Sequence, residues 1–383
     1  MQLPFPSGAA VHVAEVAESL QRIGHEVHVI ARRSSRAEPK VQDFKGVKIH
    51  RINRFIVRTG GRKAPSSSRG ERSRGLAEIL YNFYLRTAFM IYASFAARQV
   101  VSRNSLDAII ERETAFGAGG LASVLTGKPL ILEVIGPRYS RLSVRQSSSI
   151  LYYTESMLRD WVDRRKCVKV TAGVNLDVFK PDSEAGNRVK SRLHLGEFPV
   201  VGYVGSFQKW HGVDTLLQAA SLLKDKGTKI SLLMVGPSFE PYVSLTDELG
   251  LSDSCTFVGP VNYGEVAAYI NACDLLVAPY NPSKDELRKD YGIGSPIKVL
   301  EYMACGKPVI STSVPPIDSM TKDDGPMMLV SPGDPASLAD ALERLVQDPQ
   351  RATKMAGNGL KLVSEGFSWQ SFSQTLSLKI EEA

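Results

Sequence analysis

The sequence lacks the motifs that mark several large classes of cofactor- and metal-dependent protein. No G-x-G-x-x-G opens a strand–helix unit, which argues against a nicotinamide dinucleotide, and no G-x-x-x-x-G-K-[ST] is present, which argues against a P-loop. The 4 cysteines (Cys167, Cys255, Cys273, Cys305) lie far apart without a CxxC pair, and the 6 histidines show no metal-ligand spacing. We therefore expect neither a disulfide framework nor a structural zinc site, and we interpret the thiols as reduced, mostly buried groups of a cytoplasmic protein.

The sequence is long enough for two domains, and its charge is unevenly distributed. Its 383 residues, 43% apolar and 23% charged, suit two soluble globular domains of roughly 150–200 residues each, and its start lacks the basic and apolar regions of a signal peptide. Residues 32–103 hold 17 Lys/Arg against 4 Asp/Glu, within a net charge of +7 for the whole chain. This predicts an anionic partner for the N-terminal half, either a nucleic acid or an anionic lipid surface. The alternative is that residues 58–74 (RTGGRKAPSSSRGERSR) form a solvated, flexible basic loop.

The N-terminal half alternates helical and strand patterns. Helices are predicted at 8–23, 76–101 and 115–126, and strands at 25–32, 46–52, 107–112 and 128–134. This alternation predicts a parallel sheet covered by helices on both faces. We interpret the apolar stretch 76–101, interrupted by Glu78 and Arg86, as a core or interfacial helix rather than a membrane span. Only six residues precede Ser7–Gly8, so we expect the first strand of this domain to be missing, or the true start to lie upstream.

The C-terminal half repeats the alternation. Strands are predicted at 198–206, 229–236, 255–261, 274–280, 307–313 and 327–333, and helices at 212–226, 240–250, 263–272, 296–305, 335–347, 350–364 and 368–382. Residues 175–196 carry proline and charge and form the best interdomain linker. The expected division is therefore an N-terminal Rossmann-like domain at 1–174 and a second at 175–365, with 366–383 packing back on the first.

The strongest chemical signal is the segment 292–315, GIGSPIKVLEYMACGKPVISTSVP. It predicts a Gly/Ser/Pro loop, a helix, a glycine stop and a strand. The free N–H groups at the start of that helix suit a diphosphate, and Lys298 in its first turn adds a positive charge. Glu301 follows about one turn later, where a carboxylate can accept two hydrogen bonds from a ribose diol. The alternative is a helix-cap loop with surface lysine and glutamate.

This segment resembles the signature of family 4 retaining glycosyltransferases. The resemblance extends to GVNLDVFKP at 173–181, GYVGSFQKWHGVD at 202–214 and GAAVHVAEVAESLQRIGHEVHVIA at 8–31. It implies the GT-B arrangement of two facing Rossmann-like domains, with a nucleotide diphosphate sugar as donor in the C-terminal half. The implied reaction moves the sugar to an acceptor hydroxyl with retained configuration, in polysaccharide, glycolipid or other glycoconjugate synthesis.

The resemblance also implies residue roles. Glu301 would bind the donor ribose, with Lys298 and His211 as the other catalytic groups. His211 and Ser206 stand where the family often has lysine and arginine, so His211 would be a cation or donor on the phosphate; the alternative is a loop histidine packing on Trp210. The implied donor-binding residues are Gly8, Ala9, Gly205, Ser206, Lys209, Val261, Ser295, Pro296 and Ile297.

The sequence departs from the family at one acidic position. The first acid of the family's E-x7-E pattern, which contacts the transferred sugar, falls on Ile293. Asp290 or Glu286 could replace it only with a different loop arrangement. In the N-terminal half, Glu133 and Arg138 follow a predicted strand and are candidates for sugar or acceptor contacts, the alternative being ordinary ion pairing.

The remaining expectations concern cofactors and partners. The chain contains no Asp-x-Asp, so we expect no metal-dependent diphosphate site and no other cofactor. The expected acceptor is lipid-linked or a glycan, met at the cytoplasmic face of an anionic membrane by a peripheral protein, and no nucleic acid is implied. Two alternatives stay open, namely a nucleotide-sugar epimerase or sugar phosphorylase on the same fold, and a degenerate donor-binding protein without activity.

Overall fold

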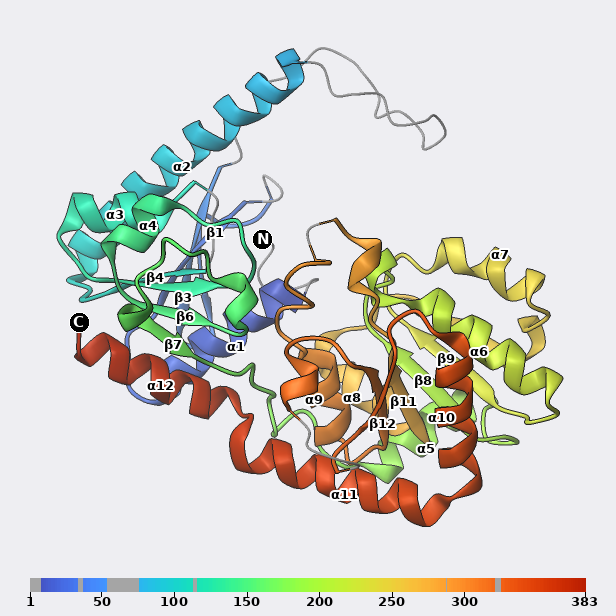
Figure 1. Ribbon diagram of the computed structural model, residues 1–383. Coiled ribbons are helices and arrows are strands. Elements are labelled where there is room, and N and C mark those ends of the chain that lie inside the picture. The colour runs from blue at the N-terminus through green and yellow to red at the C-terminus, as the bar shows by residue number, and fades with distance from the viewer. Residues whose placement is uncertain (1–7, 34–36, 54–75, 113–115, 287, 321–324) are drawn as a thin grey trace. The chain divides into compact units, whose positions relative to one another are not determined.

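The computed structural model describes all of the chain except residues 1–7, 34–36, 54–75, 113–115, 287 and 321–324 (Figure 1). The chain divides into two compact units. Unit 1 comprises Met1–Tyr152, Arg159–Val168 and Ser373–Ala383, and unit 2 comprises Tyr153–Leu158 and Lys169–Phe372.

The strands of unit 1 form two sheets in the described part of the chain. One has the order β1-β3-β2, from β1 (His28–Arg32), β2 (Val41–Phe44) and β3 (Val47–Ile52); the other has the order β4-β5-β6-β7, from β4 (Ile109–Arg112), β5 (Leu130–Val134), β6 (Ser147–Tyr152) and β7 (Cys167–Lys169). β1 pairs with β3 in parallel, but β2 pairs with β3 antiparallel. The two residues between β2 and β3, Lys45 and Gly46, both have positive φ (53° and 82°), which is the requirement of a two-residue hairpin. The pairings of β1 with β3, of β4 with β5 and of β5 with β6 are parallel, as predicted, and β2 is an antiparallel addition that makes the sheet partly mixed. The residues before Gly8, where the first strand is expected to be missing, lie outside the described residues.

The helices of unit 1 are α1 (Gly8–Arg22), α2 (Leu76–Asn104), α3 (Ala118–Thr126), α4 (Arg141–Gln146) and the last part of α12 (Trp369–Glu381). α1 buries Ala10 against Ala31 of β1 and Ile49 of β3, and Gly24 (φ 102°) supplies the predicted stop. In the described residues no helix combines the length and the apolar character that a membrane crossing requires. The His25 Nε2 lies 2.7 Å from the Ser377 Oγ, which joins α12 to the end of α1.

Unit 2 contains one parallel six-stranded sheet, as predicted. Its order is β10-β9-β8-β11-β12-β13, from β8 (Val200–Val204), β9 (Ser231–Val235), β10 (Cys255–Val258), β11 (Leu275–Ala278), β12 (Val309–Thr312) and β13 (Met328–Val330). The inner strands are continuous apolar runs because helices cover both faces of the sheet. Strand order reverses between β8 and β11, and ligands of open parallel sheets bind outside the carboxyl ends of the strands at such a point.

The helices of unit 2 are α5 (Ser183–Arg192), α6 (Val213–Asp225), α7 (Glu240–Glu248), α8 (Tyr263–Asn271), α9 (Ile297–Ala304), α10 (Pro335–Gln347), α11 (Pro349–Gly366) and the first turn of α12. The described residues of unit 2 also form the 3₁₀ helices η1 (Glu155–Met157), η3 (Lys209–His211), η4 (Ser252–Ser254), η5 (Pro282–Lys284) and η6 (Ile317–Ser319), and η2 (Arg164–Lys166) lies in unit 1. Part of the segment expected to be a linker forms α5. Its N-cap Asp182 accepts a hydrogen bond from the Ala185 N–H at 2.9 Å, and Gly186 packs on the backbone of Asn271 in α8.

Candidate functional site

The candidate site of unit 2 lies where β8 and β11 end. The loop after β8 continues through Gly205 and η3 to Gly212, where α6 begins. Gly212 has φ 68°, and a Cβ there would collide with the Pro279 carbonyl oxygen in the loop after β11. The Asn281 N–H also donates to the Trp210 carbonyl at 2.8 Å. Only glycine at position 212 lets the two loops lie this close.

Lys298 lies in an aromatic cradle between these loops. Its Nζ donates to the Tyr203 Oη at 2.9 Å and lies 4.5 Å and 4.9 Å from the ring centroids of Tyr203 and Tyr280. A Cβ on Gly205 would lie only 2.9 Å from this Nζ, so the glycine leaves the space that the ammonium fills. Burial lowers the pKa of Lys298 to about 7, although the Glu301 carboxylate raises it. An anion bound beside Lys298 would restore its charge.

His211 is buried in this site, and its expected role as a cation or donor on the phosphate stays a prediction. It is 6% exposed, and burial, followed by the nearby Lys298 charge, lowers its pKa to about 2. Its Nδ1 is hydrogen-bonded to the Ser206 carbonyl oxygen. A carbonyl oxygen can only accept, so Nδ1 carries the proton and Nε2 is an acceptor. The neutral ring also packs on Trp210, with ring centroids 3.9 Å apart, as in the alternative interpretation.

The Ser206 carbonyl joins His211 to Lys298. It accepts a second hydrogen bond, from the Tyr203 Oη at 2.5 Å, and that hydroxyl accepts from Lys298. The three side chains and one carbonyl thus form a continuous chain of hydrogen bonds. Tyr203 is fully buried, and nothing in the sequence distinguishes it, because an aromatic residue in a buried strand is typical of any core.

A second cation that the sequence analysis missed lies beside Trp210. The Arg288 guanidinium is 3.9 Å from the Trp210 ring centroid, and Trp210 stacks on Tyr280 with centroids 5.8 Å apart and planes 13° apart. Lys298 contacts the Tyr280 ring, so both rings of the stack carry a cation. Arg288 lies only four residues before the segment 292–315, but no signal in the sequence indicates that it would meet Trp210.

Ile293, at the position of the expected first acid, is buried and apolar. It is 4% exposed; its N–H donates to the Pro315 carbonyl at 3.1 Å, and its own carbonyl accepts from Arg288 at 3.3 Å. Asp290 and Glu286 are both exposed, and Glu286 pairs with Lys289 at 2.8 Å. Neither acid is among the buried groups around Lys298.

The start of α9 presents hydrogen-bond donors beside Lys298. Pro296 precedes the helix, no side chain caps it, and the Ile297 and Lys298 N–H groups lie in its first turn. The Ser295 Oγ is buried and has no hydrogen-bond partner among the described residues. Glu301 lies one turn after Lys298, partly buried and close enough to influence its pKa. A cation, an uncapped helix start and a carboxylate one turn on suit a ligand that carries both a diphosphate and a diol.

The other predicted donor-binding residues are Lys209, Val261, Gly8 and Ala9. Lys209 is exposed on η3, and Val261 is partly buried in the loop between β10 and α8. Gly8 and Ala9 are exposed in the first turn of α1 in unit 1. Their roles in donor binding stay predictions.

In unit 1 the predicted contact residues differ in exposure. Glu133, in β5, is 4% exposed; its Oε1 lies 2.9 Å from the His12 Nε2, and its Oε2 lies 3.5 Å from the Arg112 Nε. Glu133 is therefore surrounded by partners for ordinary ion pairing, which was the alternative to a sugar or acceptor contact. Burial lowers the pKa of His12. Arg138, five residues further along the chain, is exposed.

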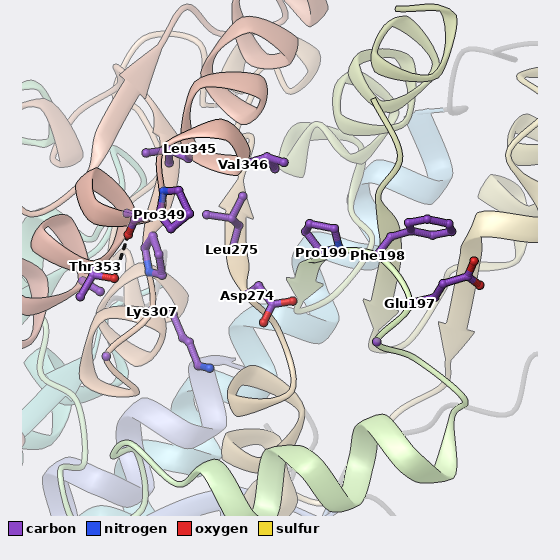
Figure 2. A pocket seen from close by; sticks show the side chains of 15 residues that line it. Glu197, Phe198, Pro199, Asp274, Leu275, Lys307, Leu345, Val346, Pro349 and Thr353 are labelled. Carbon is purple, nitrogen blue, oxygen red and sulfur yellow. Dashed lines mark hydrogen bonds between the residues drawn. The ribbon is translucent and has the colours of Figure 1, made fainter. Parts of the chain in front are cut away.

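A pocket of about 590 Å³ opens at the other end of the sheet of unit 2 (Figure 2). Pro199, Asp274 and Pro308, which precede β8, β11 and β12, line it, so it lies at the amino ends of these strands. Two of the charged residues that line it are already engaged, since Asp274 binds Lys190 at 2.8 Å and the Lys307 Nζ donates to the Asn271 carbonyl at 2.8 Å. This pocket is distinct from the cluster around Lys298.

Two family models match most of the chain. The model described as Glycosyl transferases group 1 matches residues 187–362, and the model described as Glycosyltransferase Family 4 matches residues 6–177. The D-inositol 3-phosphate glycosyltransferase of Nocardia farcinica is 30% identical over 225 residues, which are 56% of this chain and 47% of that protein, so the chain spans about half the length of this relative. The protein of the same name from Kineococcus radiotolerans is 26% identical over 404 residues, covering 94% of this chain and 87% of its own.

Among solved structures, the Anabaena protein HepE in complex with UDP and glucose matches with a TM-score of 0.73 at 16% identity, covering 100% of this chain and 98% of that chain. At this identity the likeness concerns the fold. It is the GT-B fold with two Rossmann-like α/β units, which confirms the predicted fold class.

Proposed function

Because the chain belongs to the glycosyl transferases group 1 family, we propose that it transfers a sugar from a nucleotide diphosphate sugar to an acceptor hydroxyl with retained configuration. The observation that carries the proposal is Lys298 in its aromatic cradle, one turn before Glu301 and at the uncapped start of α9. Charge grows on the departing diphosphate during transfer, and donors fixed in advance stabilise it most when water is excluded.

We assign the parts of the donor to named groups. Lys298 and the first N–H groups of α9, near Pro296 and Ile297, would hold the diphosphate, and Ser295 would donate from its buried hydroxyl. Glu301 would accept from the ribose hydroxyls. His211 would act by positioning the Ser206 carbonyl and Tyr203, since it is neutral. A UDP-sugar is the donor we favour, because HepE was solved with UDP and glucose.

Fewer observations bear on the identity of the acceptor than on that of the donor. The relatives named above are glycosyltransferases of an inositol phosphate. For this chain we propose a lipid-linked or glycan acceptor, because residues 32–103 carry a positive excess and the helix in them is rich in aromatic residues. Arg138 is the exposed candidate for contacting it, whereas Glu133 is engaged with His12. A lipid-linked acceptor would be reached at an anionic membrane surface by a peripheral protein.

The proposal is tested by incubating the full chain with a panel of nucleotide sugars and measuring release of nucleoside diphosphate. We expect one donor to be cleaved, and the release to increase when an acceptor is added. Epimerised sugar without stable transfer would support an epimerase instead. Donor binding without any release would support a protein that binds nucleotide sugar without turnover. This alternative is tested because the buried Ile293 stands at the position of the expected acid.

Donor affinity should depend on pH through Lys298. Its pKa of about 7 in the free protein means that it is largely charged at pH 6 and largely neutral at pH 8. If the charged form binds the diphosphate, affinity falls by about tenfold between these pH values. Isothermal titration with a nucleotide sugar, whose diphosphate diester does not titrate in this window, measures the change.

The control for this prediction is Lys298→Arg, which stays charged and should bind with nearly constant affinity. A pH-dependent loss of folded protein cannot explain the expected fall in affinity, because stability changes with pH in the opposite direction. The pKa of Lys298 is lowered from 10.5, so the unfolded chain binds more protons from about pH 7 upward and this group makes the fold more stable as pH rises. The same pH profile in the arginine variant would contradict the assignment.

A further inference from the structure

Helix α2 has one face fixed by packing within unit 1. Ala93, Ser94 and Val101 are buried on this face, and the Ser94 Oγ donates to the Ala118 carbonyl of α3 at 2.9 Å. α2 also packs against β1. The rotation of the helix about its axis is therefore determined, and so is the set of side chains that it leaves in solvent.

The outward face of α2 carries large apolar side chains. Tyr84 is 65% exposed, Ile91 42% and Phe95 47%, and their spacing of seven and four residues places them on one stripe of an α-helix. Tyr92, 39% exposed, flanks the stripe. Four of the eleven large apolar side chains that are exposed in the described part of the chain lie on this helix, whereas the others occur singly. A grouped, exposed apolar stripe indicates an interaction surface.

The charge around the stripe indicates an anionic partner. No acidic residue occurs between Glu78 and Asp107, and Arg98 and Arg103 are exposed on the same helix. Arg98 follows Phe95 by three residues and so lies on the same face. In Figure 1 the amino-terminal part of α2 extends beyond the other helices and strands of unit 1. An extended surface could therefore approach the stripe along the helix.

Tyrosine, phenylalanine and isoleucine beside arginine suit the boundary of a lipid bilayer. Apolar side chains enter the acyl region, tyrosine hydroxyls stay at the headgroups, and arginines bind lipid phosphates. We propose that the outward face of α2, namely Tyr84, Ile91, Tyr92, Phe95 and Arg98, binds the surface of an anionic membrane. The inference extends the proposed lipid-linked acceptor, but it stands on α2 and not on the site around Lys298.

The test is sedimentation of the full chain with vesicles of equal parts phosphatidylcholine and phosphatidylglycerol, and with phosphatidylcholine alone. We expect binding to the anionic vesicles only, and weaker binding at high salt. The variant Ile91→Ser/Phe95→Ser should bind roughly tenfold more weakly, since it removes two inserting side chains. Arg98→Gln should reduce binding about fivefold at low salt and less at high salt.

The matched control is Leu222→Ser/Val243→Ser, on α6 and α7, because both side chains are 39% exposed. It should bind vesicles as the unchanged chain does. Donor-dependent release of nucleoside diphosphate, measured without vesicles, should be equal in all variants, so a failure of the membrane proposal and a failure of the transferase proposal give different results. The proposal would be overturned by an absence of vesicle binding or by an equal loss of binding in the control. It would also be overturned if the unchanged chain were a dimer in solution and the α2 variant a monomer.

Discussion

Replacing Lys298 with methionine is expected to lower the turnover number of sugar transfer by about 100- to 1000-fold, the usual cost of removing one fixed donor that stabilises developing charge. The cause is specific to this position. The ammonium lies between the Tyr203 and Tyr280 rings, and these rings limit the access of water that would otherwise screen its charge. Steady-state kinetics with the donor identified by the panel measure the loss.

Stability separates this effect from damage to the fold. Methionine has a similar length and is apolar, and the pKa of Lys298 is already lowered by burial, so the Tm of Lys298→Met should be unchanged or higher. The matched control is Lys354→Met, because Lys354 is an exposed lysine of unit 2, on α11, and is not one of the predicted donor-binding residues. Equal turnover in the two variants would contradict the role of Lys298.

The variant Glu301→Gln is expected to bind a nucleotide sugar about a hundredfold more weakly. A carboxylate that accepts from two ribose hydroxyls contributes charge-assisted hydrogen bonds of about 1.5–3 kcal/mol each, and these contributions are not fully additive. Glutamine keeps the shape of the side chain on α9 but loses the charge. Isothermal titration of the full chain measures the change in Kd.

A dideoxy nucleotide sugar tests whether the lost affinity belongs to the ribose contact. The unchanged chain should lose most of the same affinity when the donor lacks its 2′ and 3′ hydroxyls, whereas Glu301→Gln should lose little more. Glu286→Gln is the control, since Glu286 is an exposed acid paired with Lys289. If the affinity lost through Glu301→Gln and the affinity lost with the dideoxy ligand add in full when the two are combined, Glu301 does not contact the diol.

Much of unit 2 could be predicted from the sequence. Its inner strands are buried on both faces, so each is a short apolar run between turn residues, and a helix follows each run. The loop, helix and glycine stop around α9 are equally local, because Pro296 can begin a helix and Gly306, with φ 65°, can end one. Unit 1 was less predictable. Its β2 is only four residues long, and the hairpin that reverses the sheet depends on the Lys45–Gly46 turn.

The sequence by itself therefore determined the family, the two α/β units and the position of Lys298 and Glu301 one turn apart on one helix. Only the tertiary structure decided the charge states and partners. Burial and the nearby Lys298 charge lower the pKa of His211, so the ring is neutral. Glu133 is engaged because His12 comes from a helix more than a hundred residues away along the chain. The physical reason is that helix and strand patterns depend on neighbours along the chain, whereas desolvation, ion pairing and ring stacking depend on neighbours in space.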